Sequence, residues 1–367
     1  MKVLEVTNVD FSLAHFLVPL MRGMRGRGHE VVGVCADGPL LEGVRAEGLR
    51  VVAVPMARSL SPVAQWLAFR ALVRLIRAER PDMVHGHMPI SGFLARLAAR
   101  VCGVRMVAYT CHGFLFLQPG PMWRRGLGFV VEWLGGRMTG VFTTVSTEEA
   151  GVARRVGIHC RAVAVGNGRD PAVFRPDAGA RTRVRAGLGC PGDAVVVVIV
   201  SRLVRHKGYP ELLAAMRDVP GAELWVVGER LSSDHGEEAE GWFVDAGLGR
   251  RLRRLGYRGD VAAVLAAADV FALPSQFEGL PMSVIEAMLC GLPVVATDVS
   301  GPREQVVDGE TGLLVPLGDV GALARALDRL VGDAGLRAQM GAAGRARGVA
   351  VYDEAVVVAR TLDVLGL

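Results

Sequence analysis

The order of apolar runs along the chain restricts its fold more than any other feature. Short runs rich in β-branched residues alternate with longer stretches of helical periodicity, and the alternation occurs in two series. Parallel strands joined by helices have this pattern, because a strand covered on both faces is apolar along its whole length. The first series predicts strands at residues 3–7, 30–35, 50–54, 83–87, 106–110 and 141–145. The second predicts strands at residues 195–200, 223–227, 256–258, 270–273, 293–297 and 313–315.

The two series predict an α/β protein of two doubly wound, Rossmann-like domains, which suits a chain of 367 residues. Turn-forming residues are concentrated at 166–171, and we interpret this segment as the hinge between the domains. The predicted domains are 1–168 and 169–349, and the helical segment at about 350–367 is long enough to pack back on the first domain. Helix breaks are expected at Gly332 and near Gly348.

Lysine usage points to a ligand site in the second domain. The chain has 42 Lys and Arg residues, yet its lysines are only Lys2 and Lys207. Lys207 and Arg202 follow the predicted strand 195–200, at the carboxyl end where open α/β sheets bind ligands. A guanidinium and an ammonium group at that edge would hold a diphosphate and neutralise its charge as it leaves. The alternative is that Lys207 is a solvated surface residue.

A second motif places Glu278 and Glu286 eight residues apart around a turn that runs into a helix. The spacing of Ser283 and Glu286 is that of a capping box, which predicts a helix beginning near Ser283. Gly291 supplies its stop. Free amides at the helix N-terminus would accept a diphosphate or sugar hydroxyls, and Glu278 would accept hydrogen bonds from those hydroxyls. The alternative for Glu286 is a capping role alone.

Several protein classes are disfavoured. The dinucleotide fingerprint G-x-G-x-x-G is absent after the first strand, where T-N-V-D-F-S stands, and this argues against a nicotinamide oxidoreductase. Six scattered cysteines without a C-x-x-C pair indicate neither a zinc site nor a disulfide framework. No apolar window of about 18 residues and no signal-peptide pattern are present, so we expect a cytoplasmic protein.

Charge is unequal between the two halves. Residues 1–170 hold 21 Lys or Arg against 12 Asp or Glu, a net charge of +9, and the remainder has a net charge of −4. The basic half should face an anionic partner. No nucleic-acid-binding motif appears, and arginines mixed with aromatic residues fit the surface of an anionic membrane better. Two segments could make this contact: 60–80, with Arg70, Arg74 and Arg77, and the stretch around Arg124 and Arg125. Each could instead be a core-facing helix with a solvated arginine face.

Together these features resemble the family 4 glycosyltransferases, which have the GT-B fold, and the resemblance covers nearly the whole chain. Its most specific motifs are S-R-L with K-G at 201–208, E-G-L-P with E-A at 278–287, G-L-P-V-V-A-T at 291–297 and V-D-G-E-T-G-L-L-V at 307–315. The H-G-H motif at 85–87 and Y-T-C-H-G-F at 109–114 are similar to the branch that builds capsular polysaccharide and lipid-linked oligosaccharides.

The resemblance implies two Rossmann-like domains facing a central cleft and a retaining transfer from a nucleotide sugar, usually a UDP-sugar. The acceptor would be a polyprenyl-diphosphate saccharide at the inner face of the cytoplasmic membrane, with no metal or other cofactor and no nucleic acid involved. The absence of a D-x-D motif agrees with this. Arg202 and Lys207 would stabilise the leaving diphosphate, and Glu286 would bind the ribose hydroxyls.

The remaining roles are also implied by the resemblance. Catalysis would rest on His112, Arg202, Lys207 and Glu278, with His112 reaching the donor sugar from the first domain. Donor binding would involve Arg202, Lys207, Arg258, Glu278, Gly279, Leu280, Pro281, Ser283 and Glu286. The acceptor side would include Asp10, Ser12, His85 and His87.

Two departures and several alternatives remain. The family often has paired glycines where this chain has Asp10-Phe11-Ser12, and a basic residue where it has Met282. His112 could be an ordinary loop residue, and the H-x-H spacing at 85–87 could suggest a metal, although the sequence shows no third ligand. Alternative functions are a sugar-nucleotide 2-epimerase, a glycosyltransferase with a soluble small-molecule acceptor, and a non-catalytic nucleotide-sugar binding protein.

Overall fold

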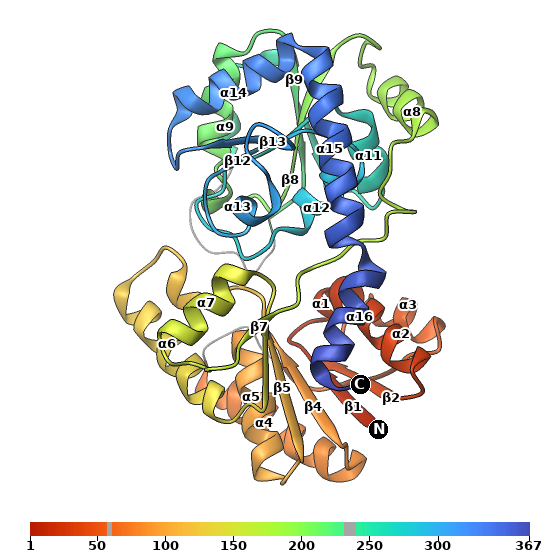
Figure 1. Ribbon diagram of the computed structural model, residues 1–367, viewed down its shortest axis with the longest axis vertical. Coiled ribbons are helices and arrows are strands. Elements are labelled where there is room, and N and C mark those ends of the chain that lie inside the picture. The colour runs from red at the N-terminus through yellow and green to blue at the C-terminus, as the bar shows by residue number, and fades with distance from the viewer. Residues whose placement is uncertain (57–60, 231–239, 245) are drawn as a thin grey trace. The chain divides into compact units, whose positions relative to one another are not determined.

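The computed structural model describes residues 1–56, 61–230, 240–244 and 246–367, so Leu60, at the start of the first basic segment, lies outside the described residues. The chain forms two compact units (Figure 1). Unit 1 comprises Met1–Gly166 with Ala355–Leu367, and unit 2 comprises Asn167–Glu354. The bounds predicted from the sequence are 168 and about 350.

Unit 1 has a parallel seven-stranded sheet of order β3-β2-β1-β4-β5-β6-β7. The strands are β1 (Lys2–Val6), β2 (Glu30–Cys35), β3 (Arg50–Ala53), β4 (Met83–His87), β5 (Met106–Cys111), β6 (Val141–Thr144) and β7 (Val163–Ala164). The helices are α1 (Asp10–Ser12), α2 (Val18–Gly26), α3 (Leu41–Ala46), α4 (Pro62–Glu79), α5 (Pro89–Val101), α6 (Met122–Arg137), α7 (Thr147–Arg155) and α16 (Glu354–Leu365).

Unit 2 has a parallel six-stranded sheet of order β10-β9-β8-β11-β12-β13. Its strands are β8 (Val195–Val200), β9 (Ala222–Val227), β10 (Leu252–Gly256), β11 (Val270–Leu273), β12 (Val294–Thr297) and β13 (Gly312–Val315). Its helices are α8 (Ala178–Leu188), α9 (Tyr209–Ala215), α10 (Glu240–Val244), α11 (Val261–Ala267), α12 (Met282–Leu289), α13 (Pro302–Gln305), α14 (Val320–Gly332) and α15 (Ala334–Tyr352).

Both sheets have the doubly wound topology that the sequence predicts. Strand order reverses between β1 and β4 in unit 1, and between β8 and β11 in unit 2. Ligands of open parallel sheets bind beyond the carboxyl ends of the strands at such a reversal. The two reversals therefore mark where the predicted site residues are to be sought.

The two faces of the first sheet carry separate cores. Val3 belongs to the core with α2 and α3, whereas Leu4 belongs to the core with α4 and α5, as the two-residue period of a strand requires. Helix α16 lies beside α2 (Figure 1), and its residues Leu362 and Leu365 are buried in the α2 core. Gly23 of α2 makes this approach possible, because a Cβ there would overlap Val358.

Three local predictions were wrong. The weak strand predicted at 256–258 lies earlier, as β10. Its central residues are two consecutive arginines, so the strand gives little apolar signal. Strand β7 was missed, since it is only two residues long. Helix α15 continues through Gly348 to Tyr352, because Gly348 is a packing residue that lies against Leu289 rather than a helix stop.

Candidate functional site

The loop after β8 is fixed against the loop after β11, across the strand reversal of unit 2. Gly208 has φ +79°, and an added Cβ would lie against the carbonyl oxygen of Pro274, closer than any real Cβ contact. Gln276 N donates to His206 O at 2.8 Å. Lys207, between these two contacts, therefore has a defined position at the carboxyl edge of the sheet.

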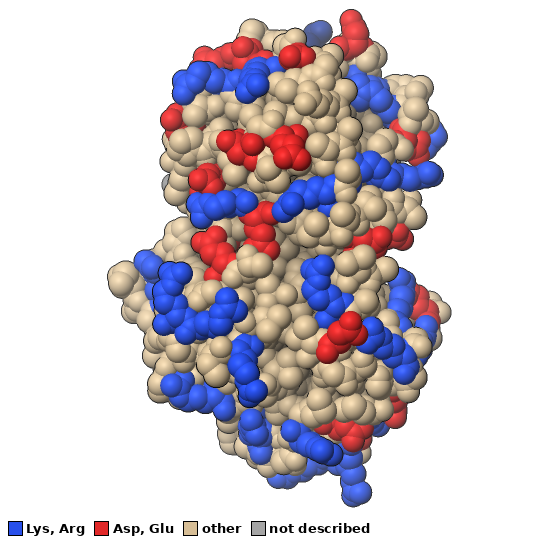
Figure 2. Space-filling model, viewed as in Figure 1, with Lys and Arg blue, Asp and Glu red and all other residues tan. Residues whose placement is uncertain are grey.

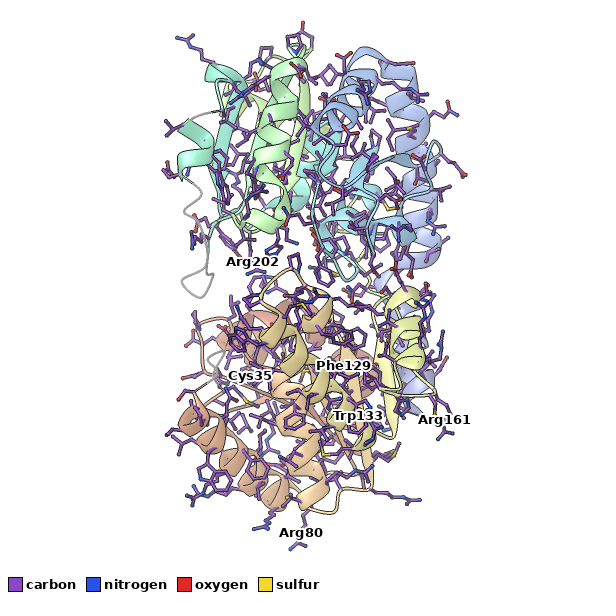
Figure 3. The ribbon with its side chains drawn as sticks, turned by 90° about the vertical axis from the view of Figure 1, so that its left-hand side faces the viewer. Cys35, Arg80, Phe129, Trp133, Arg161 and Arg202 are labelled. Carbon is purple, nitrogen blue, oxygen red and sulfur yellow. The ribbon has the colours of Figure 1, made fainter. Side chains whose placement is uncertain are left out.

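The two motifs identified separately in the sequence meet at Lys207. Lys207 Nζ donates to Glu278 Oε1 at 2.6 Å, and Ser275 Oγ donates to the same oxygen at 2.6 Å. The Lys207 and Glu278 side chains are 16% and 9% exposed. A cation and a carboxylate held together at this edge can bind a diphosphate and a sugar hydroxyl side by side. Arg202, labelled in Figure 3, follows β8 directly and is exposed at the same edge.

Side chains from outside the loop hold the turn between Glu278 and α12. Asn167 Nδ2 donates to Leu280 O at 2.8 Å, and Gln305 Nε2 donates to Pro281 O at 2.9 Å. Gly301 packs so closely on Gly279 O that no Cβ would fit. The backbone of 279–281 is therefore preorganised, as donor binding through this segment would require.

The predicted capping box is wrong. Helix α12 begins at Met282, with Pro281 as an extended N-cap and no side-chain cap, so Ser283 lies inside the first turn. Proline starts the helix one residue earlier because its fixed φ suits a helix entry. Glu286 accepts instead from Arg169 Nε at 2.7 Å. Arg258 likewise forms a pair with Asp260, with N to O distances of 2.7 Å.

A hollow of about 310 Å³ lies at the carboxyl ends of β8, β9 and β10. Glu229 lines it and accepts from Tyr257 N at 3.1 Å, which fixes the start of the Tyr257–Asp260 turn. Leu203 and Val226 give the hollow apolar walls. A planar ring with polar edges fits such a lining.

In unit 1, the strand reversal holds a buried carboxylate between histidines. Glu5 of β1 is completely buried, and its two oxygens lie 2.9 Å from His85 Nδ1 and 2.7 Å from His87 Nε2 on β4. His87 Nδ1 lies 3.1 Å from Nε2 of His112, which follows β5. Thr110 Oγ1 lies 2.8 Å from His85 Nε2. These five residues form one hydrogen-bond network, called here the histidine network.

Burial and neighbouring groups set the protonation of this network. Burial alone would raise the pKa of Glu5, but the charges and hydrogen bonds of His85 and His87 outweigh it and lower the pKa to about 2. Burial, with His85 nearby, lowers the pKa of His87 to about 4. Burial, with His87 and His85 nearby, lowers the pKa of His112 to about 3. At neutral pH the network holds an ionised Glu5 with neutral His87 and His112.

The residues predicted on the acceptor side of unit 1 have partners within unit 1. His85 and His87 are buried and bonded to Glu5, so neither lines an open surface. Ser12 is also buried, and its Oγ donates to Asn8 Oδ1 at 3.3 Å. The Asp10 carboxylate accepts from Phe11 N at 2.8 Å and from Leu40 N at 3.3 Å, so it stabilises two local turns. Their roles on the acceptor side stay predictions.

Glu5 supplies the third side chain that a metal site at His85 and His87 would need and that the sequence did not show. Within the parts of the chain that the structure describes, Glu5, His85 and His87 are the one group of three His, Cys, Asp or Glu residues with ligand atoms within 4.8 Å of one another. Every one of these atoms has a hydrogen-bond partner inside the network. We therefore assign the group to hydrogen bonding, and metal independence stays a prediction.

Protein stability should fall as the pH is lowered from 7 toward 4. His87 and His112 have pKa values of about 4 and 3 when folded and near 6.5 when unfolded, so between these values the unfolded chain binds more protons. Stability is then complete above pH 6.5 and is lost as pH falls through this window. Glu5, with a pKa of about 2 when folded and 4.5 when unfolded, adds to the loss below pH 4.5.

Urea midpoints at pH 7, 6 and 5 measure this dependence. The variant His112→Asn lacks one of the titrating groups, and its stability should depend on pH less steeply by up to about 1.4 kcal/mol per pH unit. Equal slopes for the variant and the parent would contradict the expectation.

Comparison with known proteins identifies the family. The family description "Glycosyltransferase Family 4" matches residues 14–173, and "Glycosyl transferases group 1" matches residues 180–347. The putative glycosyltransferase EpsD of Bacillus subtilis (strain 168) is 30% identical over 376 residues, covering 99% of this chain and 96% of the relative. The chain belongs to glycosyltransferase family 4. As a family 4 glycosyltransferase, it is an enzyme that transfers a sugar from a nucleotide-sugar donor, which removes the epimerase and non-catalytic alternatives.

Solved structures confirm the GT-B fold of this family 4 glycosyltransferase. Anabaena Alr3699/HepE in complex with UDP and glucose has a TM-score of 0.87 at 22% identity, covering 100% of this chain and 99% of the other. Sucrose-phosphate synthase from Thermosynechococcus elongatus has a TM-score of 0.84 at 21% identity, with 99% and 98% covered. Among the described residues, no helix has the length and apolarity needed to cross a bilayer.

Proposed function

We propose that this family 4 glycosyltransferase transfers a sugar from a UDP-sugar to a polyprenyl-diphosphate saccharide, with retention and without a metal. The main observation in support of donor binding is the contact of Lys207 and Ser275 with Glu278 at the carboxyl edge of the unit 2 sheet. The complexes of HepE with UDP and with UDP-glucose support a uridine nucleotide. The hollow beside Glu229 has the size and lining for the base.

The proposed reaction assigns a role to each of the donor-side residues. The acceptor oxygen forms a bond to the anomeric carbon on the face that the diphosphate leaves, and the acceptor proton passes to the leaving phosphate oxygen. Lys207 and Arg202 neutralise the charge that develops on that diphosphate, which makes a metal unnecessary. Glu278 orients the donor sugar through a hydroxyl, and Glu286, held by Arg169, binds the ribose.

The lipid-linked acceptor is supported by a relative and by the surface of unit 1. The Escherichia coli enzyme named UDP-Gal:alpha-D-GlcNAc-diphosphoundecaprenol alpha-1,3-galactosyltransferase is 26% identical over 90% of both chains. On the face drawn in Figure 2, blue basic side chains predominate over red acidic ones on unit 1, the lower part of the view. An anionic membrane that contains the acceptor suits this charge.

Helix α6 is the better of the two candidate membrane segments. Large apolar side chains are exposed along one face of this helix at helical spacing: Trp123, Leu127, Val130 and Leu134. On α4 the large exposed apolar side chains are confined to its first turns: Val63, Trp66 and Leu67. A hollow of about 290 Å³ beside α6 has apolar walls and two basic residues, Arg124 and Arg125. Phe129 and Trp133 belong to the same helix (Figure 3). An interfacial helix combines these features, and it would place the enzyme at the inner face of the cytoplasmic membrane.

A charge reversal on α6 tests both the acceptor and the membrane. With Arg124→Glu, we expect reduced binding to anionic vesicles and reduced transfer to a polyprenyl-diphosphate saccharide in those vesicles, by roughly 10-fold or more. One basic group contributes about 1 kcal/mol near such a surface, and its reversal doubles the change. Cosedimentation and product formation measure the two effects, and the anomeric configuration of the product tests retention.

The matched control is Arg74→Glu, at a position on α4 that is also exposed. It should bind vesicles as the parent does. If Arg74→Glu has the larger effect, the membrane segment is α4. If neither variant changes partitioning onto anionic vesicles, the membrane proposal fails.

A soluble acceptor is the second candidate. The 2-deoxystreptamine N-acetyl-D-glucosaminyltransferase of Streptomyces fradiae is 32% identical over 87% of this chain and 82% of the relative. Transfer to a water-soluble sugar or aminocyclitol as fast as to the lipid-linked saccharide would favour this candidate.

A further inference from the structure

The histidine network determines which ring nitrogen of His112 carries a hydrogen. Its buried members are Glu5, His85, His87 and Thr110, and His112 is the histidine that is partly exposed. An ionised carboxylate only accepts hydrogen bonds, and a neutral imidazole has one donor and one acceptor nitrogen. Hydrogens can therefore be counted outward from Glu5.

The network has two arms that begin at Glu5, and the first arm leads through His87 to His112. Because Glu5 only accepts, the nitrogen of His87 that faces it, Nε2, carries the hydrogen. His87 Nδ1 is then an acceptor, so the 3.1 Å contact with His112 is donated by His112 Nε2. The remaining nitrogen of His112, Nδ1, has a lone pair and no hydrogen.

The second arm is consistent with the same charge on Glu5. Because Glu5 only accepts, His85 Nδ1 donates to it, and Thr110 Oγ1 lies 2.8 Å from His85 Nε2. Thr110 Oγ1 in turn lies 2.6 Å from Thr143 Oγ1, and Thr143 Oγ1 donates to Tyr109 O at 3.2 Å. Both oxygens of Glu5 therefore have a histidine partner inside the buried network.

We propose that Glu5 is a positioning residue that acts through His87, fixing His112 as its Nε2–H tautomer so that His112 Nδ1 accepts a hydrogen bond from a sugar hydroxyl of the substrate. His112 is then a binding group that selects a hydroxyl donor. It transfers no proton in the reaction, in agreement with a pKa held near 3 by burial and by its histidine neighbours. The inference goes beyond the proposed function and does not depend on a lipid-linked acceptor.

Nitrogen-15 NMR of histidine-labelled, full-length protein gives the first test, because two-bond correlations identify the tautomer of each ring. We expect His112 in the unliganded parent to be the Nε2–H tautomer throughout pH 6 to 8. A protonated Nδ1, or an equal mixture of tautomers, would overturn the proposal whatever the activity of the enzyme. The tautomer is measured without substrate, so this test of the proposal is independent of the proposed function.

The double variant Glu5→Gln/Thr110→Val is designed to reverse the direction of the hydrogen bonds from residue 5 to His112. In Glu5→Gln the new amide group must donate to one of the two histidines. If the amide donated to His85 Nδ1, His85 Nε2 would carry the hydrogen and would need an acceptor. Thr110→Val removes the hydroxyl that would accept it, so in the double variant the amide donates to His87. His87 Nδ1 then carries the hydrogen, His112 Nε2 accepts it, and His112 Nδ1 becomes the donor.

The matched control is the single variant Thr110→Val, which leaves the arm through His87 unchanged. The double variant should have a kcat/KM roughly 10- to 100-fold below that of the control, the loss expected when a polar contact to substrate is mismatched, together with the Nδ1–H tautomer in NMR. A reversed tautomer with unchanged kcat/KM would overturn the substrate contact. An unreversed tautomer in a folded double variant would overturn the role of Glu5.

Discussion

Replacing Lys207 with alanine is expected to lower kcat/KM for sugar transfer at least about 100-fold. Positioned positive charge at a leaving group is usually the largest electrostatic contribution to such a reaction, and removal of one donor costs roughly 100- to 1,000-fold. The substitution also leaves the Glu278 carboxylate with Ser275 as its remaining partner, although the Glu278 side chain is only 9% exposed. Initial rates across a series of donor concentrations measure the effect.

The matched control is Arg205→Ala. Arg205 lies in the same short turn, is exposed, and pairs with Glu211 at 2.8 Å, so its loss removes one positive charge without touching Glu278. Its kcat/KM should stay within a few-fold of that of the parent, because exposed ion pairs contribute little. Similar losses in both variants would mean that Lys207 acts through net charge rather than by contact.

Replacing Gly208 with alanine is expected to destabilise unit 2 by about 2 to 4 kcal/mol, since strain at a positive φ and steric overlap each cost about 1 to 3 kcal/mol. The residue has φ +79°, and the new methyl group would overlap the Pro274 carbonyl. Relief of the overlap would move the loop that holds Lys207. We therefore expect a lower unfolding midpoint and weaker UDP binding in the same variant.

Gly187→Ala provides the comparison. Gly187 lies in α8 of the same unit, where a Cβ would meet no atom within 4 Å. Alanine there should raise stability by about 0.5 to 1 kcal/mol, because glycine weakens a helix interior. A Gly208→Ala variant as stable as the parent would contradict the close approach of the two loops.

The sequence was sufficient for the fold because most of the predicted strands are buried along most of their length. β8 and β11 are apolar throughout, so their bounds agree with the prediction at both ends. The observed β10 lies before the predicted strand. It is half-exposed, and the start of such a strand depends on packing against its neighbours more than on its own residues. Gly348 shows the same limit, since the contact it makes with Leu289 depends on tertiary structure.

The site was predicted in part, for a related reason. Lys207 and Glu278 are distinctive residues beside turn signals, and the structure brings them into contact. Ser275 and Arg169 were missed, because an ordinary serine and one arginine among many have no local pattern. Glu5 was also missed, although a charged residue inside the buried strand β1 is a signal that could have found it. The roles in donor binding remain predictions.

The return of α16 to unit 1 has a consequence for how the enzyme is made. Unit 1 is interrupted by the whole of unit 2, and the α2 core lacks Leu362 and Leu365 until α16 has been synthesised. Domains usually fold in order of synthesis, at about 5 to 20 residues per second on the ribosome. Here the unit that begins first is completed last. A nascent chain therefore carries a finished unit 2 while the apolar face of α2 is still without α16.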